Sequence, residues 1–351
     1  MLRRLARLDC PWGRASGGGA AFAWYTQYHA PLLLPVLRLV VELGCPVNWA
    51  AIRELAASFS ADVPAAPALA AAAAAAPHTG LPLSSALEAA AVDRIDLYQG
   101  VSDRPGRETV AFAYRRSSCA DWNREHPDRL FADPVFHGAL PRGGVFVDIG
   151  ACYGDTSVPL AVLADMVVAL EPNPHSFRVL ELNAQLNPGL RIRPHNVAAG
   201  DGNLTELEFT YGGDMCNGGV LGAWKDASRE TPLKVKAVDV PSFLRQEYGE
   251  GVLRNISLIK IDAEGFDAKI MTTLRPLLRY SKFTLLVEWF DYYVSSPPHG
   301  NEGPDAVHPG ARELFDAVAG LGYVPYDPAT GARVPGPQNK HKLPDLLCRP
   351  A

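Results

Sequence analysis

The sequence predicts an α/β fold built on a mainly parallel sheet, and three observations lead to this class. Short, mainly apolar runs recur along the second half of the chain, as strands buried on both faces of a sheet should. Most of these runs end beside an acidic residue and a turn. Stretches with the apolar spacing of helices lie between them, and this alternation of strand and helix is typical of parallel sheets.

The first run, Val145–Ile149, contains Asp148 and leads into a glycine turn at Gly150 and Gly154, followed by a helix over 158–164. Glycines let a backbone bend sharply and approach a ligand closely, because they carry no Cβ atom. The spacing D-x-G-x-x-x-G is wider than the dinucleotide pattern G-x-G-x-x-G and begins with a carboxylate. It favours S-adenosylmethionine, a cofactor with a positively charged end and no pyrophosphate.

The second run, Met166–Leu170, ends at Glu171, 21 residues after Gly150. A carboxylate at this place in a nucleoside-binding α/β fold can accept hydrogen bonds from two ribose hydroxyls. A helix is expected over 176–186 and a third strand over 191–197, whose end at His195 and Asn196 would lie beside the adenine.

The alternation of strand and helix then breaks. Residues 204–209 and 233–238 alternate between apolar and polar, which predicts an antiparallel pair. The glycine-rich segment 212–231 between them is either a mobile loop near a site or the tip of this hairpin. A short helix is expected over 242–248.

The fourth core strand, Ile256–Ile261, is followed by three acids within six residues: Asp262, Glu264 and Asp267. Ligands of open α/β sheets bind beyond the carboxyl ends of the strands, where these acids would lie. A fifth strand over 283–287 ends at Glu288, and later segments predict a helix over 311–321 and an antiparallel pair formed by 323–326 and 346–348.

The organisation of the chain before this domain is less regular. Four arginines and one acid in the first 30 residues are typical of either an organellar transit peptide or an unprocessed basic tail, so the expected location is an organelle or the cytoplasm. Strands are expected at 96–99 and 109–114. The predicted divisions are a basic, mostly helical segment, an Ala/Pro-rich linker, a part leading into the catalytic domain, and that domain itself: 1–60, 61–80, 81–142 and 143–351.

Composition excludes several classes of protein. A hydrophobic fraction of 48% is that of a core-forming chain, and a net charge of −5 gives no general attraction for nucleic acid. No apolar run reaches the roughly 18 residues that a membrane span needs. The six cysteines show neither metal-binding spacing nor C-x-x-C pairs, so we expect free thiols and no metal centre.

Taken together, the segments VFVDIGACYGDTS, VVALEPNP, HNVAAGD, LIKIDAEGFD and LLVEW resemble the FkbM family of S-adenosylmethionine-dependent methyltransferases. The resemblance covers roughly 143–330 and implies a Rossmann-like, seven-stranded class I methyltransferase sheet with helices on both faces. It implies methyl transfer, with hydroxyls of small molecules or sugars as acceptors. The family commonly has asparagine where this chain has Cys152, and glutamate where it has Asp267.

The resemblance implies a set of cofactor-binding residues. Glu171 would hold the ribose, Asn196 would lie near the adenine, and Asp262 would lie near the methionine end or the acceptor. The remaining predicted contacts belong to the glycine turn and to the turn after the second strand: Asp148, Gly150, Cys152, Gly154, Thr156 and Asn173.

The expected chemistry is an in-line displacement in which a carboxylate or imidazole takes the acceptor's proton. Glu264 is the first candidate for this base, Glu288 the second, and Asp262 either takes part or anchors the cofactor's ammonium group. His195 is more typical of a packed structural histidine. A divalent ion held by Asp262, Glu264 and Asp267 is a minor alternative.

Two other functional classes stay open at this point. A nicotinamide-dependent oxidoreductase would need the tighter glycine spacing, which the chain lacks. A non-catalytic cofactor-binding or regulatory protein with the same fold is the main alternative, because Cys152 departs from the family pattern and residues 1–130 carry no assigned role.

Overall fold

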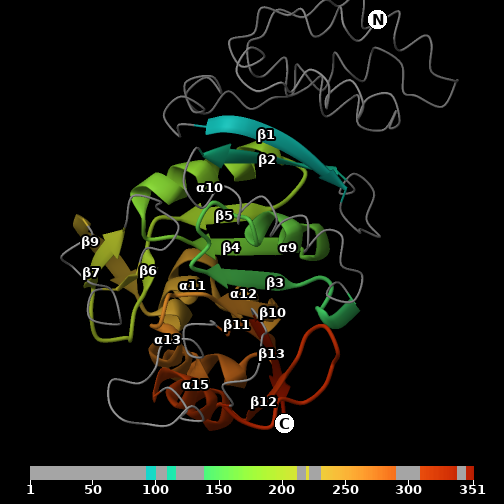
Figure 1. Cartoon of the computed structure of the whole chain (residues 1–351), viewed down its shortest axis with the longest axis vertical. Coiled ribbons are helices and arrows are strands. Elements are labelled where there is room, and N and C mark those ends of the chain that lie inside the picture. Colours follow the sequence, from blue (N-terminus) through green and yellow to red (C-terminus); the bar gives the residue numbers. More distant parts are fainter. Residues whose placement is uncertain are drawn as a thin grey trace, which may run out of the picture. The chain divides into compact units, whose positions relative to one another are not determined.

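The computed structural model describes residues 92–99, 109–115, 138–211, 219–220, 231–289, 309–337 and 345–351 (Figure 1). The expected N-terminal helical segment and the linker at 61–80 lie outside these residues, as does most of the glycine-rich segment 212–231. The chain divides into two compact units, Met1–Asp96 and Leu97–Ala351. All described residues except 92–96 belong to the second unit.

A seven-stranded mixed sheet forms the centre of this unit, in the order β12-β13-β11-β10-β3-β4-β5. Neighbours from β11 to β5 are parallel, while β13 runs antiparallel to both β11 and β12. The predicted closing antiparallel pair is confirmed by the pairing of β12 with β13. The strands are β3 (Val145–Ile149), β4 (Met166–Leu170), β5 (Ile192–His195), β10 (Ile256–Ile261), β11 (Thr284–Glu288), β12 (Tyr323–Tyr326) and β13 (Asp345–Pro350).

Helices cover both faces of the sheet (Figure 1). The helices α9 (Ser157–Leu163) and α10 (Pro174–Leu186) connect β3 to β4 and β4 to β5, and right-handed crossovers place both on one face. The other face carries α11 (Val240–Tyr248), α12 (Glu250–Asn255), α13 (Asp267–Thr273), the 3-10 helix η3 (Arg275–Arg279) and α15 (Pro309–Gly320).

Strand alternation divides the buried side chains between the two faces. In β3, Val145, Val147 and Ile149 join a core that includes apolar residues of α11, α13 and α15. Phe146 and Asp148 point to the opposite face, where the hydroxyl of Ser157 in α9 bonds Asp148. The sequence pattern did not predict α12 or α13.

Helix starts follow local chemistry. Asn173 caps α10 by accepting the backbone N–H of His175 at 3.0 Å, and Pro174 occupies the first turn. Asp239 caps α11 by accepting the N–H of Ser242 at 3.0 Å. These caps fix where the helices begin, and therefore where the turns before them end.

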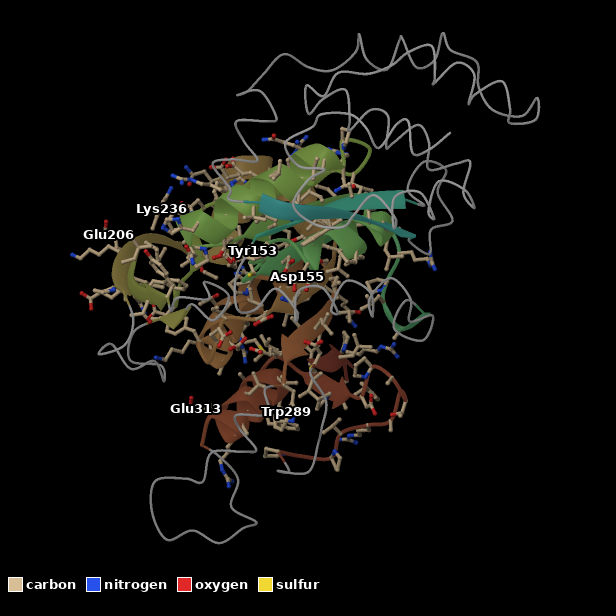
Figure 2. The ribbon with its side chains drawn as sticks, turned by 45° about the horizontal axis from the view of Figure 1, so that its top comes forward. Tyr153, Asp155, Glu206, Lys236, Trp289 and Glu313 are labelled. Atoms are coloured by element: carbon tan, nitrogen blue, oxygen red, sulfur yellow. The ribbon has the colours of Figure 1, made fainter. Side chains whose placement is uncertain are left out.

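A second, four-stranded sheet has the order β6-β9-β7-β8, with β6 (Ala198–Ala199), β7 (Glu206–Tyr211), β8 (Gly219–Val220) and β9 (Thr231–Val238). The predicted antiparallel pairing of β7 with β9 is confirmed. Leu207 and Val235 face the core, whereas Glu206 stands opposite Lys236 on the exposed face (Figure 2). Opposite charges across an antiparallel pair favour this register.

The predicted early strands are present as β1 (Val92–Gln99) and β2 (Thr109–Arg115), which form a two-stranded sheet. Within the described residues, no helix combines the length and apolar character that crossing a membrane requires.

Candidate functional site

The glycine turn after β3 touches the end of β10. Gly150 has φ +76°, and a Cβ atom placed there would lie 1.7 Å from the carbonyl oxygen of Asp262. The N–H of Asp262 donates to the carbonyl of Ile149 at 3.0 Å, which fixes this approach. No side chain can stand at 150 without separating the two strand ends, so the turn and Asp262 form one site.

Glu171, at the end of β4, is the polar centre of the neighbouring turn. One carboxylate oxygen accepts the backbone N–H of Cys152 and the other accepts that of Asn173, each at 2.7 Å. Because each carboxylate oxygen has two acceptor positions, one on each stays available for a ligand hydroxyl. Glu171 is 5% exposed, and burial raises its pKa to about 7 despite the two N–H donors.

The two asparagines predicted near the cofactor both support this turn. Asn173 is buried and caps α10. Asn196 is exposed and donates its amide hydrogens to the carbonyls of Glu171 at 2.8 Å and Pro172 at 3.0 Å. Their contacts place them beside Glu171, while direct contact with adenine stays a prediction.

Asp148 lies beneath the glycine turn and is fully buried. Its carboxylate accepts the hydroxyl of Ser157 at 2.5 Å and lies 3.5 Å from the ammonium of Lys260. Lys260 also donates to Asp262 at 2.9 Å. Asp148 therefore contacts Ser157 and Lys260. Lys260 in turn orients Asp262 through its hydrogen bond.

Lys260 is a buried cation among carboxylates. Burial alone would lower its pKa, but Asp262, Asp148 and Asp155 together raise that pKa well above the ordinary value for lysine. The ammonium therefore stays charged and favours the ionised form of Asp262 beside it. A charged residue inside an otherwise apolar strand was a signal visible in the sequence, yet Lys260 was not among the predicted site residues.

Three carboxylates meet beyond the ends of β10 and β11. Asp262, Glu264 and Glu288 each place an oxygen within 4.8 Å of the others. These are the three residues predicted to take part in catalysis. Burial raises the pKa of Glu288 well above its usual range, and the carboxylates around it, with a hydrogen bond to Asp262, raise it further. The carboxyl group of Glu288 therefore favours its protonated form more than an ordinary glutamate does.

The turn that carries Glu264 is strained and tightly capped. Glu264 has φ +50°, which side-chain-bearing residues rarely adopt, and Gly265 follows with φ +90°. Asp267 accepts the N–H groups of Ala263 and Gly265, both at 3.0 Å, and burial raises its pKa to about 6. Asp267 thus holds the turn, while Glu288 rather than Asp267 stands beside Asp262 and Glu264.

The rest of the glycine turn is mostly buried. Cys152 has φ +47° and its thiol is free; burial raises its pKa well above the usual value, and the charges of Asp155 and Glu171 add to this. Thr156 is buried at the start of α9. Asp155 (Figure 2) was not among the predicted site residues, and burial raises its pKa to about 7. A positive φ favours asparagine or glycine over cysteine at position 152.

His195 has the contacts of a structural residue. Its ring nitrogen Nε2 lies 2.6 Å from the hydroxyl of Tyr248, and the ring packs edge-on against Phe243 with centroids 4.9 Å apart. Burial lowers its pKa. These contacts give the imidazole a packing role on α11.

Comparison with known proteins finds one family model that matches part of the chain. Residues 148–315 match the model of the methyltransferase FkbM domain. A search of the curated proteins finds no match.

Solved structures with a similar chain path have low identity. The FkbM methyltransferase of Methylobacillus flagellatus KT is 15% identical with a TM-score of 0.33, over 64% of this chain and 50% of that one. M. jannaschii TYW2 in complex with AdoMet is 15% identical with a TM-score of 0.33, over 69% and 83%. Precorrin-6y C5,15-methyltransferase of Geobacter metallireducens GS-15 is 12% identical with a TM-score of 0.32, over 68% and 91%. The chain thus spans half the length of the Methylobacillus protein, and its fold assignment rests on the order of its strands.

Proposed function

We propose that this chain is an S-adenosylmethionine-dependent methyltransferase of the FkbM family, whose domain model matches residues 148–315, and that it methylates a hydroxyl oxygen of a small molecule or sugar. The observation that carries this proposal is the group of three carboxylates, Asp262, Glu264 and Glu288, beside the glycine turn. A hydroxyl acceptor must lose its proton as it is methylated, and carboxylates at this place are suited to receive it.

The residues of the site fit the cofactor. The contact of Gly150 with the Asp262 carbonyl leaves the turn without a side chain there, and Glu171 keeps an acceptor position on each oxygen for the two ribose hydroxyls. S-adenosylmethionine supplies an electrophilic methyl group on a positively charged sulfur. Asp262, ionised beside Lys260, complements positive charge at the methionine end or at the sulfur.

The roles within the carboxylate group follow from their surroundings. Burial and the surrounding carboxylates favour the protonated form of Glu288, and the ammonium of Lys260 bonds Asp262. We therefore assign to Glu264 the role of the base that receives the acceptor's proton. Strained backbone at a site is a recognised sign of function, and Glu264 has it.

The test starts with calorimetric titration of the full chain with S-adenosylmethionine and S-adenosylhomocysteine, with NADH as the control. We expect micromolar binding of the two sulfur compounds alone. Turnover is then measured by mass spectrometry with paired acceptors that differ only in carrying a hydroxyl or an amine at one position. Methylation of the hydroxyl acceptor supports the proposal, and methylation of the amine alone would overturn it.

A further inference from the structure

Asn183 in α10 and Asn187, the C-cap residue of that helix, bind β2 in the manner of a neighbouring strand. Asn183 accepts the N–H of Ala113 at 2.6 Å and donates to its carbonyl at 3.2 Å. Asn187, one helical turn later, accepts the N–H of Ala111 at 2.8 Å and donates to its carbonyl at 2.7 Å. Each side-chain amide thus replaces the peptide group of a paired strand, and both side chains are buried.

Asn183 makes one bond that Asn187 does not. Its amide nitrogen also donates to the carbonyl oxygen of Tyr153 at 2.8 Å, whereas that of Asn187 donates to the carbonyl of Asn183 within the helix at 2.7 Å. Tyr153 lies in the middle of the glycine turn (Figure 2). One buried amide therefore contacts β2 and the turn at once.

The bond from Asn183 completes the anchoring of one peptide group. The carbonyl of Tyr153 belongs to the peptide whose N–H, that of Gly154, donates to the carbonyl of Ala151 at 2.7 Å. Both ends of this peptide are thereby held, directly after Cys152 with its φ of +47°. Releasing one end would remove a restraint on the turn that holds Cys152 at this angle.

We propose that Asn183 is a positioning residue for the cofactor site: its amide holds the Tyr153–Gly154 peptide, and with it the shape of the glycine turn. Asn183 is fully buried, so it acts through this peptide and not by touching a ligand. The inference rests on the proposed function, because it takes the glycine turn to be the cofactor site. Since β2 precedes the residues that match the family, it also ties that earlier segment to the site.

The chain offers a matched control for this role. Asn187→Ala removes the equivalent pairing with β2, together with the bond to the Asn183 carbonyl, but leaves the bond to Tyr153 in place. Asn183→Ala removes both its pairing with β2 and the bond to Tyr153. We expect similar losses of thermal stability in the full chain. We expect Kd for S-adenosylhomocysteine to rise about five- to tenfold in Asn183→Ala, as for the loss of one buried hydrogen bond, and less than twofold in Asn187→Ala.

A second readout needs no ligand. Cys152 carries a free thiol within the turn, and the rate at which iodoacetamide alkylates it can be followed by mass spectrometry of its peptide. We expect a severalfold faster rate in Asn183→Ala and an unchanged rate in Asn187→Ala. If alanine at 183 prevents folding, Asn183→Leu and Asn187→Leu fill the space and permit the same comparison.

The outcomes separate this inference from the proposed function. Equal changes in Kd and in alkylation rate for the two variants would overturn the inference alone, because the effect would then come from β2. Failure of the unsubstituted chain to bind S-adenosylhomocysteine would overturn the cofactor site. In that case an alkylation rate that rises only in Asn183→Ala would still assign the turn's shape to Asn183.

Discussion

The carboxylate of Glu171 accepts the backbone N–H of Cys152 at 2.7 Å, so the end of β4 holds the turn that comes after β3. Its other oxygen accepts the N–H of Asn173 from its own turn at the same distance. One side chain therefore fixes two turns that converge on the same site. Its protonation state affects the shape of the site as well as its charge.

Replacing Glu171 by alanine should weaken S-adenosylhomocysteine binding by about 1.5–3 kcal/mol, because charge-assisted hydrogen bonds to the ligand are lost.

Binding of S-adenosylhomocysteine should also depend on pH in the unsubstituted chain. The pKa of Glu171 is about 7, and ligand hydroxyls bind its ionised form, so affinity should fall as pH drops from 8 to 6. Calorimetry of Glu171→Gln should show weak binding of S-adenosylhomocysteine that does not fall further as the pH drops. A Kd equal to that of the unsubstituted chain would contradict the role of Glu171 in binding the ribose.

Glu264→Gln should lower kcat by about 10²–10⁴-fold while leaving cofactor affinity nearly unchanged, because the variant loses a base and keeps the shape of the turn. Glu288→Gln is the matched comparison, since burial and the neighbouring carboxylates favour the protonated form of the carboxyl group that it replaces. Its kcat should fall much less. Steady-state kinetics with one hydroxyl acceptor decides between them, and a larger loss in Glu288→Gln would exchange their roles.

Gly150→Ala should destabilise the protein by about 3 kcal/mol or more, because the new Cβ atom would stand 1.7 Å from the Asp262 carbonyl and force the strand ends apart. Gly251→Ala in α12 is the control: nothing lies within 4 Å of its Cβ, so it should gain about 0.5–1 kcal/mol of helix propensity. Chemical denaturation measures both. Similar stabilities would mean that β3 and β10 separate easily.

The stability of the ligand-free protein should fall as pH rises from about 4 to 7. The folded-state pKa values of Asp155 and Glu171 are about 7 and that of Asp267 is about 6, all raised by burial, so folding takes up protons in this range. The stability that these three carboxyl groups contribute is fully present below their pKa values in the unfolded chain. It is lost as the pH rises through their pKa values in the folded protein. The lowered pKa of His195 has the opposite effect on stability, but it is one group against these three carboxyl groups.

Thermal unfolding at several pH values checks this slope. Asp155→Asn cannot take up the proton, so its midpoint should depend less steeply on pH than that of the unsubstituted chain. A midpoint that rises between pH 5 and 7 in the ligand-free protein would contradict the prediction.

The sheet could be predicted because most of its core strands are local apolar runs with an acid beside their ends. Glu171, Asp262 and Glu288 were identified for the same reason, since parallel strands end at one edge of a sheet. Lys260, Asp155 and Asn183 were missed. The charge of Lys260 within an apolar strand was visible in the sequence but was not used. The role of Asn183 depends on Ala113, 70 residues earlier, and no local pattern encodes such a contact.

Asn183 and Asn187 also occupy backbone groups along one edge of β2. A strand with free N–H and C=O groups along one edge is a template on which another chain can add a strand. The strand β2 pairs with β1, and the amides of Asn183 and Asn187 occupy the backbone groups of Ala113 and Ala111. At these two positions the backbone of β2 is already hydrogen-bonded, so the end of α10 takes the place of a neighbouring strand without contributing one.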